Sequence, residues 1–262
     1  MTNFRWEYTS YLLKEPRKTS CVKLGELLSV DNKQINRFLM GNRDTKELYD
    51  EIEPYIELEW WQLCIDDSVL DKEFSIESKS DLVWKFWSWR HKSVVLGINL
   101  ITLFYVDKNW RKFPVNWRIF DKKEEKTKND YFLEMYSEVL FWWLKPSMVS
   151  WDSRYASAKN LKFITTQWMW FDFSLKSNRL VRLENAEKYQ NVSELQIPEE
   201  WIVVHLKDVW TVKLFKHQGF IHAYRVPHQE KKRAWRQSSS VTRKEFEVSH
   251  RNHWSVEEVT SQ

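Results

Sequence analysis

Glycine is the residue that this sequence lacks most. The 262-residue chain has only 4 Gly but 17 Trp, whereas glycine makes up about 7% of an average protein. Some Trp stand in polar turns where a positive φ is expected, such as Trp110 in Asp107-Lys108-Asn109-Trp110. A bulky L-residue adopts that conformation only at a cost. The fold therefore has to accommodate Trp at positions that favour Gly.

Cysteine and long apolar runs are also scarce. Cys21 and Cys64 lie in apolar segments without metal-type spacing, which predicts reduced core thiols in a cytoplasmic protein. The sequence has neither a signal-peptide pattern nor an apolar run of about 18 residues, so we expect no membrane partner. A net charge of +4 permits nucleic-acid binding without requiring it.

Residues 1–58 are predicted to form a small, all-helical DNA-binding region. The pattern predicts helices at 21–28 and 33–40 around a polar turn, which is typical of a helix-turn-helix. The second helix carries side chains that can reach phosphates and base edges, namely Lys33, Gln34, Asn36 and Arg37. A generic helical hairpin is the alternative. A third helix is expected from residue 45, with Pro54 kinking or ending it.

The second region, residues 59–262, opens with an apolar run that ends in Asp66 and Asp67. Such a run predicts a buried strand. Two adjacent carboxylates raise each other's pKa unless a cation lies beside them. Oxygen ligands at a strand end suit Mg²⁺ or Mn²⁺. The alternative is a strand followed by a solvated acidic turn.

Strands and helices then alternate along the chain. We expect a hairpin of strands at 94–106 and 113–120, and helices at 130–144 and 157–166. Further strands are expected at 148–152, ending in Asp152, and at 169–175. Asn129 is the predicted cap of the 130–144 helix, and Trp143 is predicted on its buried side. A β-rich insertion at about 180–226 and a final helix from residue 242 complete an α/β fold with a mixed sheet flanked by helices.

Three carboxylates from distant segments can converge in this fold. Asp67 and Asp152 would lie at neighbouring strand ends of one sheet. On the final helix, His250, His253 and Glu257 share one face, which can turn toward those strand ends. Such a triad can bind two Mg²⁺ ions and activate a water or a 3′-hydroxyl for attack on a phosphodiester. Unrelated surface carboxylates are the alternative.

Short motifs across nearly the whole chain resemble DDE transposases of bacterial insertion sequences, which have an RNase H-like catalytic core. The matching motifs are Ile65-Asp66-Asp67-Ser68-Val69-Leu70-Asp71-Lys72, Gly97-Ile98-Asn99-Leu100-Ile101-Thr102-Leu103, Lys126-Thr127-Lys128-Asn129-Asp130, Asp152-Ser153-Arg154-Tyr155-Ala156-Ser157, Leu175-Lys176-Ser177-Asn178-Arg179 and His253-Trp254-Ser255-Val256-Glu257. The resemblance implies an RNase H-like mixed sheet with a β-rich insertion.

The resemblance also implies the chemistry. It makes Asp67, Asp152 and Glu257 the catalytic and metal-binding triad for two Mg²⁺ or Mn²⁺ ions, with Asp66 and Glu258 as alternatives for the first and third places. It implies double-stranded DNA, both element ends and target, as the partner of a bacterial cytoplasmic protein that is a homo-oligomer on DNA. The residues expected to contact DNA in this region are Lys126, Lys128, Lys176, Arg179, His250 and His253. A solvated loop is the alternative for the charge run at 121–130.

The chain also departs from the family. His250 and His253 replace a Tyr and an Arg, Arg154 replaces a Trp, and a Lys expected beyond Glu257 is missing, as in a C-terminally truncated member. A truncated DNA-binding remnant that represses its own element is therefore an alternative function, and an RNase H-like nuclease is another.

The Trp excess can be interpreted through the same resemblance. It suggests Gly at five Trp positions, namely Trp89, Trp110, Trp151, Trp201 and Trp210. One hypothesis is that UGA codons, read as Gly in the source, were translated as Trp. A decaying element with true substitutions is the alternative.

Overall fold

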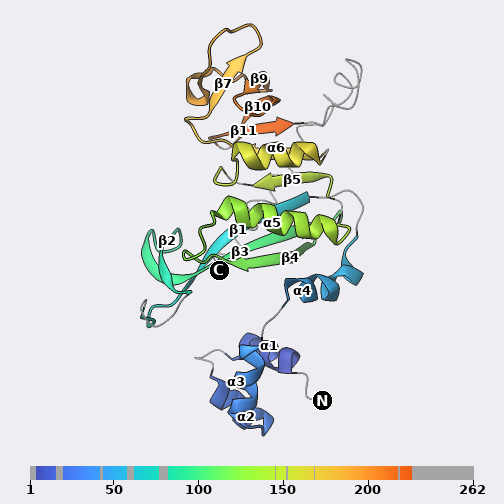
Figure 1. The fold of residues 1–262 in the computed structure, drawn as a ribbon, viewed down its shortest axis with the longest axis vertical. Helices are drawn as coiled ribbons and strands as arrows, with labels where there is room; N and C mark the ends of the chain where they lie inside the picture. The colour runs from blue at the N-terminus through green and yellow to red at the C-terminus, as the bar shows by residue number, and fades with distance from the viewer. Residues whose placement is uncertain are drawn as a thin grey trace. The chain divides into compact units, whose positions relative to one another are not determined.

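The computed structural model describes residues 4–15, 20–41, 44–57, 62–76, 82–144, 146–151, 153–167, 169–217 and 219–225. The chain divides into two compact units between Glu47 and Leu48 (Figure 1). This division lies on the N-terminal side of the boundary predicted at residue 58. Within the described ranges, every helix is too short or too polar to cross a lipid bilayer.

The first unit is helical. Its elements are α1 (Phe4–Lys14), α2 (Cys21–Leu28), α3 (Asn32–Met40) and the beginning of α4 (Thr45–Ile52). Tyr11, Leu24 and Ile35 form its small buried core. The turn between α2 and α3 is tight, because a Cβ on Gly25 would lie 2.8 Å from the carbonyl oxygen of Val30. The two predicted helices around a turn are therefore confirmed, and their contact with DNA stays a prediction.

Helix α4 ends where the sequence predicts. A 3₁₀ turn, η1 (Glu53–Tyr55), follows it directly and contains Pro54. Proline cannot donate the backbone hydrogen bond that would continue the helix. Tyr49 of α4 is buried in the second unit and packs on Trp142, with the two rings tilted and their centroids 5.3 Å apart.

The second unit is built on a large mixed β-sheet. The strands of its first half are β1 (Gln62–Asp71), β2 (Trp84–Ser88), β3 (Ser93–Val106), β4 (Lys112–Ile119), β5 (Met148–Trp151) and β6 (Trp170–Ser174). β1 pairs antiparallel with β3 and parallel with β5, and β6 pairs parallel with β5. β4 and β2 both pair antiparallel with β3. The predicted hairpin of β3 and β4 is confirmed.

The β-rich segment at 180–226 continues this sheet. Its strands are β7 (Leu180–Leu183), β8 (Gln190–Asn191), β9 (Ile202–Leu206), β10 (Thr211–His217) and β11 (Phe220–Arg225), with a 3₁₀ turn η3 (Val192–Glu194) after β8. β11 pairs antiparallel with β6, so the segment is hydrogen-bonded to the edge of the first half. The strand order is β2-β3-β1-β5-β6-β11-β10-β9-β7-β8, with β4 also on β3.

Two helices pack on the sheet (Figure 1). α5 (Lys128–Phe141) contacts β3 and β4, and α6 (Ala158–Thr166) contacts β6. Phe132, Met135 and Val139 of α5 are fully buried, as their spacing predicts. The predicted cap Asn129 is wrong, because Thr127 caps α5 and forms a capping box with Asp130.

Trp143 does not lie on the buried side of α5 as predicted. It follows the end of the helix, its side chain is 77% exposed, and its φ is 69°. Trp110 has a φ of 63°, which confirms the positive φ expected at that turn. Trp89, Trp151, Trp201 and Trp210 do not have positive φ. Trp151 is buried in β5 and packs on Phe132 and Phe173.

Candidate active site around Asp67

Asp67 lies inside a strand and not at its end. β1 continues through Asp66 and Asp67 to Asp71, because all ten of its residues pair with the longer β3. The predicted strand end at the two carboxylates is therefore wrong. Successive strand residues point to opposite faces of a sheet, so the two carboxylates are separated. Asp66 accepts a hydrogen bond from the backbone N–H of Asp67 at 2.7 Å.

Four side chains from three segments surround the Asp67 carboxylate. From β3, Asn99 donates its amide to Oδ2 at 3.1 Å. Lys128, the first residue of α5, donates to the same oxygen at 2.5 Å. After β5, Arg154 donates to Oδ1 at 3.2 Å and the Tyr155 hydroxyl donates to Oδ1 at 3.4 Å. Both carboxylate oxygens are thus hydrogen-bonded, and each contacts a cation.

The electrostatic balance keeps Asp67 ionised. Burial alone would raise its pKa, because a charged carboxylate loses hydration. Lys128 and Arg154 outweigh burial, and the pKa of Asp67 lies below its ordinary value. The side chain is only 5% exposed, so this is a buried and compensated negative charge.

Asn99 is a residue of this cluster that was not among the predicted site residues. It interrupts the apolar run of β3, which could have served as a signal, and it is 1% exposed. β1 pairs Val69 with Asn99, so Asn99 shares a face of the sheet with Asp67. Its Oδ1 is buried without a hydrogen-bond partner in the described part of the chain.

Of the predicted triad, only Asp67 is among the described residues. Asp152, Glu257, His250 and His253 lie outside them. β5 ends at Trp151, directly before Asp152, and pairs with β1 so that Ser150 lies opposite Cys64. The predicted neighbouring strands are therefore confirmed, and the positions of the other two carboxylates stay predictions.

The other residues predicted to contact DNA are distributed over both units. Lys33, Gln34, Asn36 and Arg37 are exposed on α3, and Lys176 is exposed after β6. Lys126 forms ion pairs with Glu134 at 3.0 Å and Glu124 at 3.4 Å. Arg179 is half-buried, its Nε and Nη2 have no hydrogen-bond partner among the described residues, and burial lowers its pKa. Only Lys128 among these residues touches Asp67.

The oxygen atoms at Asp67 and Asn99 suit a hard cation and would form part of a metal site. The Asp67 carboxylate and the unpartnered Asn99 Oδ1 are oxygen donors, the type that Mg²⁺ and Mn²⁺ prefer. The described residues contain no cluster of three His, Cys, Asp or Glu side chains that could hold a metal. A complete site would need the predicted Asp152 and Glu257.

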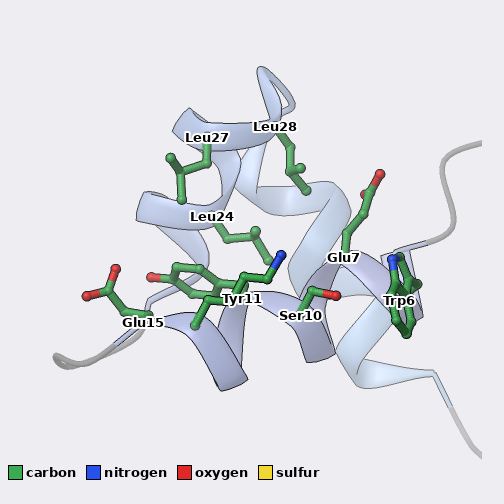
Figure 2. A pocket seen from close by; sticks show the side chains of 9 residues that line it. Trp6, Glu7, Ser10, Tyr11, Glu15, Leu24, Leu27 and Leu28 are labelled. Atoms are coloured by element: carbon green, nitrogen blue, oxygen red, sulfur yellow. The ribbon is translucent and has the colours of Figure 1, made fainter.

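A separate hollow lies between α1 and α2 of the first unit (Figure 2). It has a volume of about 340 Å³ and is lined mainly by apolar side chains, among them Trp6, Tyr11 and Leu24. Glu15 at its edge is ion-paired with Lys23. The hollow adds no ligand to the cluster around Asp67.

Comparison with known proteins finds a likeness to a solved structure but none to a known sequence family. No family model and no curated protein sequence matches the chain. A solved piggyBac transposase, in a synaptic complex with hairpin DNA, is similar at 10% identity with a TM-score of 0.45. The match covers 85% of this chain and 51% of the transposase chain, so this chain spans about half the length of that protein. A TM-score below 0.5 does not establish a common fold.

Proposed function

We propose that the protein is a transposase of an insertion sequence that cleaves DNA at the ends of its element and joins them to a target. The observation that carries the proposal is a buried Asp67 carboxylate, paired with Lys128 and Arg154, in a mixed sheet beside the strand that leads into Asp152. An isolated buried carboxylate is costly to keep charged. A buried carboxylate that is kept charged by neighbouring cations is therefore typical of a functional site.

The order of the strands supports an RNase H-like core. An antiparallel set of β1, β3 and β4 is continued on the other side of β1 by the parallel strands β5 and β6. The mixed sheet implied by the resemblance also combines antiparallel and parallel strands, with Asp67 and Asp152 on neighbouring strands. β7 to β11 correspond to the β-rich insertion.

Each residue has a proposed role. Asp67, Asp152 and Glu257 hold two Mg²⁺ or Mn²⁺ ions, which supply an activated oxygen nucleophile and stabilise the leaving oxygen. Asn99 orients Asp67 through its amide. Lys126, Lys128, Lys176 and Arg179, with His250 and His253, contact phosphates. The exposed polar side chains of α3 contact the ends of the element, and the protein assembles as a homo-oligomer on that DNA.

The test is a cleavage and strand-transfer assay on labelled DNA from the element ends, with Mg²⁺ and with EDTA. Asp66 and Asp67 provide a matched pair, because they are adjacent and on opposite faces. We expect Asp67→Asn and Asp152→Ala to abolish cleavage and joining, and Asp66→Asn to retain both. Equal activity of Asp66→Asn and Asp67→Asn proteins would contradict the assignment.

The same assay separates the alternative functions. Specific binding of end DNA without cleavage, in Mg²⁺ or Mn²⁺, would indicate a repressor of the element. Cleavage without preference for the ends would indicate a nuclease. Binding through phosphates should also weaken steeply as salt concentration rises, because each neutralised phosphate releases counterions.

A further inference from the structure

The cations around Asp67 occupy both oxygens that a metal would need. Lys128 contacts Oδ2 and Arg154 contacts Oδ1. The side chain of Asp67 is 5% exposed, whereas those of Lys128 and Arg154 are 26% and 43% exposed. The two cationic groups are therefore the solvent-accessible part of the cluster. A divalent ion that approached the carboxylate would meet two positive charges at short distance.

Both cations are placed where they can change partners. Lys128 begins α5 at the end of the charge run, and its ammonium lies 5.6 Å from the centre of the Phe120 ring. Arg154 belongs to the loop between β5 and α6. Lys and Arg are the side chains that bind phosphates, Lys as a flexible point charge and Arg as a planar fork. A DNA backbone offers each of them an anion to replace Asp67.

We infer that Lys128 and Arg154 transfer from Asp67 to DNA phosphates, so that metal binding at Asp67 is coupled to DNA binding. The exchange conserves charge pairing: the phosphates take the two cations, and the carboxylate becomes available to a divalent ion. The inference rests on the proposed function. It adds an order of binding to the proposed function: DNA binds first, and the protein without DNA is protected from metal loading.

The coupling has a reciprocal consequence. If DNA raises the affinity for metal, metal must raise the affinity for DNA by the same factor. Lys126 provides a matched control, because it lies two residues from Lys128 but pairs with Glu124 and Glu134 instead of Asp67. Its loss should weaken DNA binding without changing metal binding in the absence of DNA.

The test measures Mn²⁺ binding by the electron paramagnetic resonance signal of free Mn²⁺, with and without element-end DNA at constant ionic strength. We expect DNA to raise the Mn²⁺ affinity of the natural chain by about 5- to 150-fold, the usual range of coupling between sites. Lys128→Gln and Arg154→Gln should bind Mn²⁺ more tightly without DNA and gain less from DNA. Lys126→Gln should match the natural chain without DNA, and Asp67→Asn sets the background.

Fluorescence anisotropy of labelled DNA, with and without Mn²⁺, checks the reciprocal factor. Equal Mn²⁺ affinity with and without DNA in the natural chain would overturn the inference, as would weaker Mn²⁺ binding by both Lys128→Gln and Arg154→Gln. Circular dichroism verifies that each variant is folded. The natural chain with and without DNA decides the matter even if a variant fails to fold.

These outcomes are distinct from failure of the proposed function. If Asp67→Asn binds Mn²⁺ like the natural chain and no cleavage occurs, the proposed function is wrong. If Mn²⁺ binding needs Asp67 and DNA is cleaved, but DNA does not change the Mn²⁺ affinity, only the coupling is wrong.

Discussion

Replacing Trp143 by Gly should stabilise the protein, although it removes the largest side chain in favour of the smallest. α5 ends in a Schellman motif: the N–H of Leu144 donates to the carbonyl of Val139 at 3.1 Å, and the N–H of Trp143 donates to that of Leu140 at 3.1 Å. Trp143 occupies the left-handed position that this motif usually gives to Gly, with a φ of 69°. Leu144 and Val139 are both fully buried, as the motif favours.

The magnitude follows from three contributions. A left-handed conformation costs an L-residue about 1–2 kcal/mol. Gly offsets part of that gain, because it loses roughly 0.5–1 kcal/mol more conformational freedom on folding. Little burial is lost, since Trp143 is 77% exposed. We expect a net gain of about 1 kcal/mol, which corresponds to roughly 2–4 °C in Tm for a unit of this size.

The assay is urea unfolding monitored by circular dichroism. A fluorescence signal would be unsuitable, because the variant lacks one Trp fluorophore. Trp201→Gly is the control, because the φ of Trp201 is not positive and its ring contacts the Lys213 ammonium, 4.1 Å from the ring centre. That variant should lose stability, through the cation–π contact and through chain entropy. A Trp143→Gly protein that is less stable than the natural chain would contradict the expected cost of the left-handed conformation.

Three further predictions concern single residues. Mass spectrometry of the native protein should find Gly at Trp89, Trp110, Trp151, Trp201 and Trp210 if UGA is read as Gly, and UGG codons at these five positions would exclude that hypothesis. Burial raises the pKa of Cys64 to about 12, so Cys64 should react with a thiol reagent only after unfolding. The pKa of Asp67 is lowered on folding, so its contribution to stability is present above the unfolded value of about 3.9 and is lost as pH falls through the folded pKa. The natural chain should therefore have a higher unfolding free energy than Asp67→Asn at neutral pH, and this difference should disappear in acid. A difference that persists at low pH would contradict the lowered pKa of Asp67.

Local features of the fold could be predicted from the sequence because their causes are local. The long apolar run specifies β3, the spacing of Phe132, Met135 and Val139 specifies α5, and Pro54 ends α4. In each case the residues that decide the outcome lie within the element or directly after it.

The surroundings of Asp67 could not be predicted because their causes are distant. β1 runs on past the carboxylates because β3 is long enough to pair with all of it. Lys128 and Arg154 reach Asp67 across 61 and 87 residues of sequence. Trp143 was misplaced because the 3.6-residue period was extended one turn too far, past the point where α5 ends.

The place of β1 in the sheet also has a consequence during synthesis. Its hydrogen-bonding partners on one side come from β3, but those on the other side are residues 148–150 of β5. At 5–20 residues per second, a ribosome needs roughly 4–17 s to translate from β1 to β5. Until then one edge of an apolar strand stays unpaired, which is the state in which nascent chains aggregate. Yield on expression should therefore depend on translation speed and on chaperones that cover this edge.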